Sequence, residues 1–162
     1  MPRVPSSYPS YAAPCDPGLP EAALKFRLSH SPPLTTPRLL GGINVTAWLY
    51  QDRAGVKGIQ VNPNTTIEEL IRQFGPAATP DAEVGIHSEM RAGEWFRMHG
   101  SQYRVLQIFS ERIPCPKMCG PMLRAYFPGV PWYYYYDRRS WIAPNGSILK
   151  HPAQVLKTVY SL

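Results

Sequence analysis

The sequence predicts an α/β domain in which helices flank a central mixed sheet that starts with a β-hairpin. Apolar and polar residues alternate over two consecutive strand-length segments, 43–51 and 56–61, and a nearly continuous apolar segment follows at 103–111. Segments with a helical spacing of apolar residues lie between and after them. The chain has 162 residues, 44% of them hydrophobic, which suits one globular domain with an additional segment.

The first 40 residues differ in composition from the rest of the chain. They contain nine of the 19 prolines, and proline disfavours long helices and sheets because it lacks a backbone N–H and fixes φ. We therefore expect residues 1–40 to form an extended linker or a wrapping arm, in which 20–26 is compatible with a short helix. Residues 41–162 are expected to form the globular domain.

A hairpin starts the globular part. Four apolar residues spaced by two are expected to share the core face of its first strand. They are Ile43, Val45, Ala47 and Leu49. The turn-like residues 52–55 then lead into the returning strand.

Two helices and the apolar strand are expected after the hairpin. The first helix is predicted over 64–76, where Thr65 or Thr66 caps its start and Gly75 marks its end. The second is predicted over 87–100. Segment 103–111 is then a central strand that is buried on both faces.

The C-terminal part is expected to add two helices and a strand. A third helix starts near Pro116, because proline is tolerated at the first helical position. A strand is predicted over 132–136, a turn over 143–146, and a closing helix over 151–162. Three residues of this closing helix are expected to face the core, namely Val155, Leu156 and Val159.

Two short stretches carry residues suited to metal chemistry. His87 and Glu89 form a His-x-Glu pair at the expected start of the second helix, and Cys115 and Cys119 lie near the expected start of the third. A catalytic zinc ion commonly has three protein ligands and an open position for water, whose pKa it lowers to roughly 7. We expect one imidazole and two thiolates to bind Zn²⁺, and Glu89 to act as the catalytic proton shuttle. The positive ends of both helix dipoles favour negative charge there.

This combination, H-x-E followed by P-C and a second cysteine, resembles the signature of zinc-dependent nucleobase deaminases. The separation of 28 positions between His87 and Cys115 leaves room for the helix and strand that this family places there. Residues 41–162 look most like the deaminase domains of bacterial polymorphic toxins, a group that includes cytosine deaminases acting on DNA. The resemblance implies a cytidine deaminase-like three-layer fold, with His87, Cys115 and Cys119 as zinc ligands and Glu89 as the proton shuttle.

The spacing of the two cysteines departs from the family pattern. The family usually has C-x-x-C, whereas this chain has C-P-K-M-C at 115–119. Positions i and i+4 lie on the same side of a helix, so both sulfur atoms can still reach one metal ion.

The resemblance also implies a function. It indicates a hydrolytic deaminase that converts cytosine to uracil in nucleic acid, with DNA favoured over RNA, and a monomer neutralised by a cognate immunity protein. The protein would be secreted as an effector and delivered into the cytoplasm of a target cell, with the export signal carried elsewhere. The alternatives are a deaminase of RNA or of free nucleosides or nucleotides, and, in another class, a non-catalytic binding module stabilised by zinc.

Charge and aromatic residues are compatible with a nucleic-acid substrate. The net charge of +6 favours a polyanionic partner, although a solvated basic surface also explains it. Residues 132–141 combine aromatic rings, on which bases can stack, with arginines that can contact phosphates; core filling is the alternative. The candidate substrate contacts are Trp95, Ser110, Glu111, Tyr134, Tyr136, Arg138 and Arg139. No membrane association is expected, because no apolar stretch approaches the roughly 18 residues of a membrane span.

Overall fold

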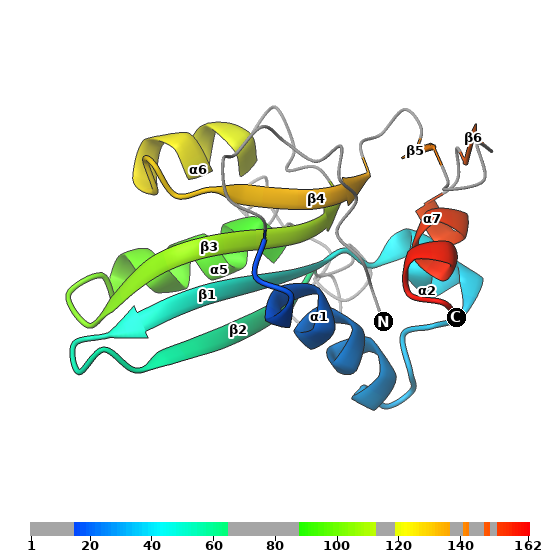
Figure 1. Ribbon diagram of the computed structural model, residues 1–162, viewed down its shortest axis with the longest axis horizontal. Coiled ribbons are helices and arrows are strands. Elements are labelled where there is room, and N and C mark those ends of the chain that lie inside the picture. The colour runs from blue at the N-terminus through cyan, green and yellow to red at the C-terminus, as the bar shows by residue number, and fades with distance from the viewer. Residues whose placement is uncertain (1–14, 65–87, 113–118, 137–140, 143–147, 150–151) are drawn as a thin grey trace, which may run out of the picture.

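A four-stranded mixed sheet with helices on both of its faces forms the centre of the computed structural model (Figure 1). The structure describes residues 15–64, 88–112, 119–136, 141–142, 148–149 and 152–162. The strands of the sheet, in chain order, are β1 (Val45–Asp52), β2 (Lys57–Pro63), β3 (Tyr103–Arg112) and β4 (Trp132–Tyr136). A separate ladder joins β5 (Trp141–Ile142) to β6 (Ile148–Leu149).

The strand order in the sheet is β2-β1-β3-β4. β1 is antiparallel to both β2 and β3, whereas β4 runs parallel to β3. The predicted hairpin, the predicted central strand and the predicted strand at 132–136 are therefore confirmed. β3 is buried on both faces, since Ile108 and Phe109 point to opposite sides and are both fully buried.

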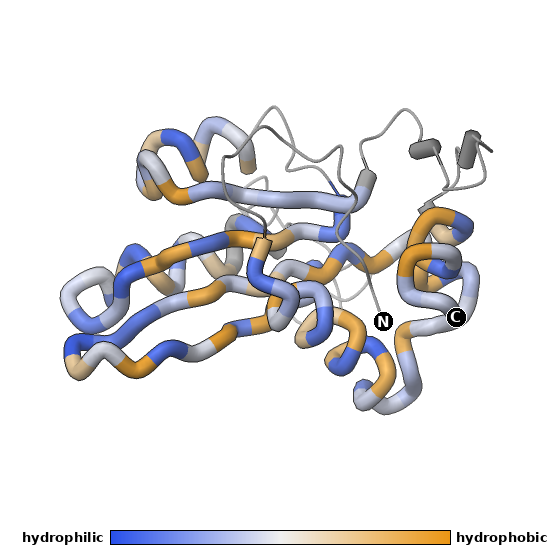
Figure 2. Tube along the Cα trace, in the orientation of Figure 1, coloured by the Kyte–Doolittle hydropathy of each residue, from blue (hydrophilic) through white to orange (hydrophobic). Residues whose placement is uncertain are grey.

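Side chains on the two faces of the sheet enter two separate cores. Val45, Ala47 and Leu49 of β1 lie in the core that α1 (Gly18–Ser29) and α7 (Pro152–Val159) cover. On the other face, Trp48 of β1 packs against α5 (Ser88–Met98) and α6 (Cys119–Tyr126). Figure 2 shows apolar residues alternating with more polar ones along β1 and β2, whereas β4 has a uniform intermediate hydropathy. This alternation, which the sequence predicted for β1, produces a layer of helices on each side of the sheet.

Residues 1–40 are expected to form an extended linker or a wrapping arm; the part of them that the structure describes packs on the sheet, and α1 contains the segment 20–26 that is compatible with a short helix. α1 buries Leu19 and Ala23 against the sheet, and α2 (Pro37–Gly42) buries Leu40 in the same core. The prolines do not interrupt these helices, because Pro17 caps the start of α1 and Pro37 occupies the first turn of α2. Residues 15–42 therefore belong to the same folded unit as the sheet.

The remaining predicted helices can be compared only in part. α5 agrees with the helix predicted over 87–100, and α7 agrees with the closing helix, whose three expected core residues are buried. The described part of α6 begins at Cys119, and the predicted start near Pro116 lies outside the described residues. The helix predicted over 64–76 and the turn predicted over 143–146 lie outside the described residues, apart from the first residue of the former. Among the described helices, none has the length and apolar character to cross a membrane.

Candidate functional site

Glu89 and Cys119 meet where α5 and α6 begin. The Cys119 thiol donates a hydrogen bond to Oε2 of Glu89 at 3.6 Å, and both side chains are buried, with exposed fractions of 3% for Glu89 and 0% for Cys119. Gly93 allows α5 to approach α6 closely, because a Cβ atom at this position would lie only 2.8 Å from Cε of Met122. The packing of the two helices thus brings together a carboxylate and a thiol that are 30 positions apart in the sequence.

The other oxygen of Glu89 is held by two neutral groups. Ser110 on β3 has its hydroxyl 2.8 Å from Oε1 of Glu89, and the side-chain amide of Asn44 donates to the same oxygen at 3.2 Å. Asn44 also donates to the Ser110 hydroxyl at 3.0 Å. The Ser110 hydroxyl also lies 2.6 Å from the Arg112 carbonyl, and its single proton is donated to one of these two acceptors. The two contacts orient the Glu89 carboxylate, so that Oε1 faces β1 and β3 while Oε2 faces Cys119.

The orientation of Asn44 is determined by its backbone contacts. Its Oδ1 accepts a hydrogen bond from the N–H of Arg112 at 3.0 Å, and a backbone N–H can only donate. The amide nitrogen of Asn44 must therefore face Glu89. The backbone N–H of Asn44 donates to Oδ1 of Asn64 at 2.6 Å, which ties this residue to the end of the hairpin. The sequence analysis missed Asn44, because a single polar residue before a strand carries no distinguishing signal.

Two of the three expected zinc ligands, His87 and Cys115, lie outside the described residues. Within the residues that are described, no group of three or more His, Cys, Asp and Glu side chains is arranged to hold a metal ion. The described part of the expected centre is therefore one thiol ligand, Cys119, next to the expected proton shuttle, Glu89. A thiol is a favoured ligand for zinc, and a carboxylate beside it can exchange protons with a bound water molecule.

Glu111 lies on the opposite face of the sheet from Glu89, fully buried. Its carboxylate forms a two-pronged ion pair with Arg27 of α1, at 2.7 Å from Nη2 and 2.9 Å from Nε. The Tyr160 hydroxyl donates to the same carboxylate at 2.6 Å, and the backbone N–H of Val45 donates at 2.9 Å. This arrangement uses the carboxylate to join β3 to α1, β1 and the C-terminal residues, and the expected contact of Glu111 with substrate stays a prediction.

Tyr160 belongs to the same buried cluster as Glu111 and Arg27. Burial raises the pKa of its hydroxyl well above the ordinary value, and the neighbouring Glu111 carboxylate raises it further. The neutral phenol is the form that this core accommodates, since an ionised phenol would face the Glu111 carboxylate without water.

The aromatic candidates occupy different environments. In β4, Tyr133 and Tyr135 are core residues, as the predicted alternation requires, while half-buried Tyr134 pairs with Ser110 in the register of β3 and β4. Trp95 is further along α5 and stacks on His99 and Tyr103, at centroid distances of 4.1 and 5.4 Å. Tyr134 therefore lies beside Ser110 on the neighbouring strand. The ring of Trp95, in contrast, packs against the rings of His99 and Tyr103.

The remaining candidates are not described in full. Arg138 and Arg139 lie outside the described residues, and for Tyr136 only the backbone, at the end of β4, is described. Their expected contacts with substrate therefore stay predictions. Ser110 is fully buried and its hydroxyl contacts Glu89, so it supports the carboxylate and is not shown to touch substrate.

Comparison with known proteins identifies no relatives. No protein-family model, no curated protein and no solved structure matches the chain. The function therefore has to be inferred from the residues around Glu89 and from their chemistry.

Proposed function

We propose that this protein is a zinc-dependent hydrolytic deaminase that converts cytosine to uracil in nucleic acid, with DNA favoured. The observation that supports it best is the contact between the Cys119 thiol and Oε2 of Glu89 at 3.6 Å, across two helices. A sequence with H-x-E and P-C-x-x-x-C stretches predicts such a contact if both stretches contribute to one metal centre. The mixed sheet, with a hairpin at its edge and helices on both faces, is compatible with the expected fold.

The proposed zinc ligands are His87, Cys115 and Cys119. Two residues of chain span at most about 7 Å and four span about 14 Å, so His87 is tethered close to Glu89 and Cys115 close to Cys119. When bound, zinc would supply a water molecule with a pKa lowered to roughly 7. The donor set fits this ion, because the described thiol is buried beside a carboxylate that is not needed as a ligand.

Glu89 would move protons in the proposed reaction. With Oε1 held by Ser110 and Asn44, Oε2 is the oxygen on the Cys119 side, where the substrate ring would have to lie. Glu89 would accept a proton from the attacking water and transfer it to N3 of cytosine as oxygen bonds to C4. It would then move the remaining proton of the C4 hydroxyl to the amino group, so that the C4–N bond breaks and ammonia leaves. The products are uracil and ammonia, and no oxidant or reductant is consumed.

The substrate base has to be accessible. A base within a duplex cannot reach a buried carboxylate, so the target cytosine would be flipped out or already single-stranded. The proposed contacts to the strand remain Tyr134, Tyr136, Arg138 and Arg139. Binding would weaken at high salt, because arginines that neutralise phosphates release bound counterions. Delivery into a target cell as a toxin and neutralisation by an immunity protein belong to the same proposal.

The direct test is deamination of a single-stranded DNA oligonucleotide that contains one cytosine. We expect uracil from the natural protein with zinc, and none above background from Glu89→Gln. Glu94→Gln is the matched control, since Glu94 is an exposed carboxylate on the same helix, and it should retain full activity. RNA and free cytidine as substrates test the two related alternatives.

Two outcomes would contradict the proposal. If Glu89→Gln deaminates as well as the natural protein, Glu89 is not the proton shuttle. If zinc binds stoichiometrically but DNA, RNA and free cytidine are all unchanged, the non-catalytic binding module is the better explanation.

A further inference from the structure

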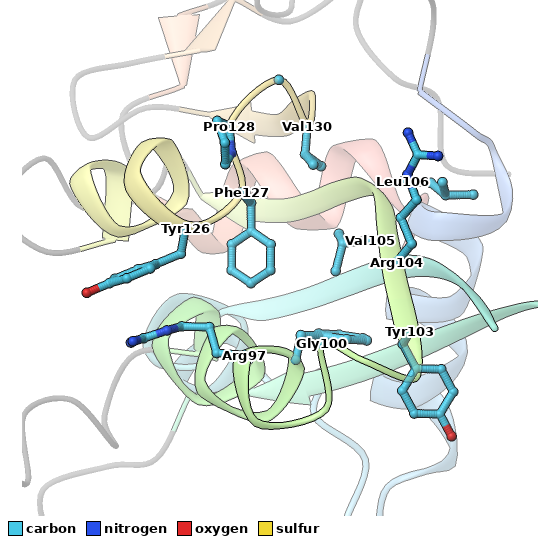
Figure 3. Close-up of a pocket in the computed structure, with 12 residues that line it drawn as sticks. Arg97, Gly100, Tyr103, Arg104, Val105, Leu106, Tyr126, Phe127, Pro128 and Val130 are labelled. Carbon is cyan, nitrogen blue, oxygen red and sulfur yellow. The ribbon is translucent and has the colours of Figure 1, made fainter. Parts of the chain in front are cut away.

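A cavity of about 720 Å³ lies at the opposite end of α5 and α6 from Glu89 (Figure 3). Its walls are the end of α5, the start of β3 and residues 126–130 after α6. Arg104 and Ser110 are six positions apart on β3, which corresponds to roughly 20 Å of strand. The cavity is therefore separate from the candidate active site and has no part in the proposed chemistry.

One edge of β3 is open beside this cavity. β4 pairs with β3 only from Ile108 to Arg112, and the last backbone bond on this side runs from the Ile108 N–H to the Pro131 carbonyl at 3.0 Å. On their other side, Tyr103–Val105 and Gln107 pair with β1, with Leu106 in a bulge between them. Within the described residues, no strand pairs with Tyr103–Gln107 at the cavity. In Figure 3, Val105 points into the space between Phe127 and Gly100. Such an edge can pair with an added strand.

The charge around this edge is positive. Arg97 and Arg104 line the cavity, and none of the described residues that line it is acidic. Neither arginine forms an ion pair with another described residue. The guanidinium of Arg97 lies 3.6 Å above the ring of Tyr126, which holds it at the cavity wall. Two positive charges beside an unpaired strand edge favour an acidic ligand in extended conformation.

We propose that the start of β3 is a docking site for an extended acidic segment of a partner protein, which pairs with Tyr103–Gln107 as an additional strand. Its backbone would bond to β3, its carboxylates would approach Arg97 and Arg104, and alternate apolar side chains would enter the cavity beside Phe127. A second copy of this chain is disfavoured, because a symmetric pairing would bring the same arginines together. Nucleobases are disfavoured because Arg97 covers one face of Tyr126 and Trp95 stacks on Tyr103.

The test uses an acetylated and amidated hexapeptide of alternating valine and glutamate, with a peptide of valine and lysine as the charge control. We expect only the glutamate peptide to bind, and to slow amide hydrogen exchange at Val105 and Leu106. Arg97→Glu with Arg104→Glu should weaken this binding at least tenfold. Arg124→Glu is the matched control, since Arg124 is exposed on α6 outside the cavity, and it should bind as the natural protein does.

Three outcomes would overturn the docking site. Equal binding of both peptides would show that charge does not select the ligand. Absence of glutamate-peptide binding at millimolar concentration would show that the arginines and the bulge in β3 only protect the edge from pairing. Binding of a thymidine oligonucleotide at this edge, but not of the peptide, would make it a nucleic-acid surface. Glu89→Gln should bind the peptide normally, so failure of the proposed deaminase leaves this test unaffected.

Discussion

Two buried carboxylates, those of Glu89 and Glu111, lie on opposite faces of β3 and have different hydrogen-bond partners. Ser110 contacts Glu89 on the face covered by α5 and α6, and the next residue, Glu111, enters the core below α1 and α7. The Glu111 carboxylate accepts hydrogen bonds from the Arg27 guanidinium, the Tyr160 hydroxyl and the backbone N–H of Val45. The contacts described around Glu89 include three neutral groups, namely an amide, a hydroxyl and a thiol.

This difference separates a structural carboxylate from one that is suited to chemistry. A carboxylate in a two-pronged pair with a buried arginine keeps its charge and its position, because losing either partner exposes the other to a high desolvation cost. A carboxylate held by neutral donors is oriented without a permanent counter-charge from them, which suits a group that has to gain and lose protons. Substitutions at the two carboxylates and at their partners should therefore have different effects on stability and on activity.

Arg27→Met should have the largest effect on stability. It leaves the Glu111 carboxylate buried without its guanidinium partner, and breaking a buried pair in this way costs about 3–5 kcal/mol. Urea unfolding followed by circular dichroism measures the change. Lys25→Met is the matched control, because Lys25 is exposed on the same helix, and it should change stability by less than about 0.5 kcal/mol. A loss below about 1 kcal/mol for Arg27→Met would show that the pair is not structural.

The same conservative change at the two carboxylates should give opposite results. Glu111→Gln removes the charge opposite Arg27 and should destabilise the fold by several kcal/mol, roughly as Arg27→Met does. Glu89→Gln should cost about 1 kcal/mol or less, because glutamine can accept from Ser110 and Asn44 as glutamate does. It should nevertheless lower deamination about 100-fold or more. Similar stability losses for both variants would show that Glu89, like Glu111, is a structural carboxylate.

Ser110→Ala should have an intermediate effect. It removes the hydroxyl that lies 2.8 Å from Oε1 of Glu89, so we expect a stability loss of about 1–2 kcal/mol. Activity should fall about tenfold while the KM changes little, since the orientation of the carboxylate is affected and no substrate contact is lost. Ser29→Ala, an exposed serine of α1, is the control. A rise in KM at unchanged kcat would instead assign Ser110 to substrate binding.

The stability of the fold should also decline at alkaline pH. Burial, followed by the Glu111 carboxylate, raises the pKa of Tyr160, so the folded state retains a proton that the unfolded state loses near pH ~10. This contribution is fully present below that pH and is lost as pH rises above it. Tyr160→Phe should reduce the slope of unfolding free energy against pH by about 1.4 kcal/mol per unit in this range.

A second buried group adds to the same decline and provides a control. Burial, followed by the Asp16 carboxylate, raises the pKa of Cys15 to about 12. Cys15→Ala should therefore reduce the slope from about pH 9 upward and leave the Tyr160 contribution unchanged. Identical slopes for Tyr160→Phe and the natural protein would show that Tyr160 is not buried in its neutral form.

Elements with a regular local pattern could be predicted from the sequence. The hairpin, the central strand and the closing helix follow from periodicity alone, because β1, β3 and α7 place regularly spaced apolar residues in the cores. α1 and α2 were not predicted as packed elements, because nine prolines dominated the composition of the first 40 residues. The prolines at 17 and 37 lie at helix starts, where the missing N–H is not needed.

The site was predicted only where residues are close in sequence or match a known signature. The adjacency of Ser110 and Glu111 suggested a shared role, yet strand alternation places them on opposite faces. The partner of Glu111 is Arg27, 84 positions away, and no local pattern identifies such a pair. Asn44 was missed for the same reason, since its contacts with Glu89 and Ser110 form only when the sheet assembles.

Metal binding tests the central claim most directly. The natural protein and Glu89→Gln, prepared in medium with added zinc, should each contain one zinc ion per chain by elemental analysis, since Glu89 is proposed as a proton shuttle and not as a ligand. Cys119→Ser should lose the metal, and cobalt substitution should produce thiolate-to-metal absorption in the natural protein but weaker absorption in this variant. A natural protein without stoichiometric zinc, or a Cys119→Ser variant that binds it unchanged, would contradict the account.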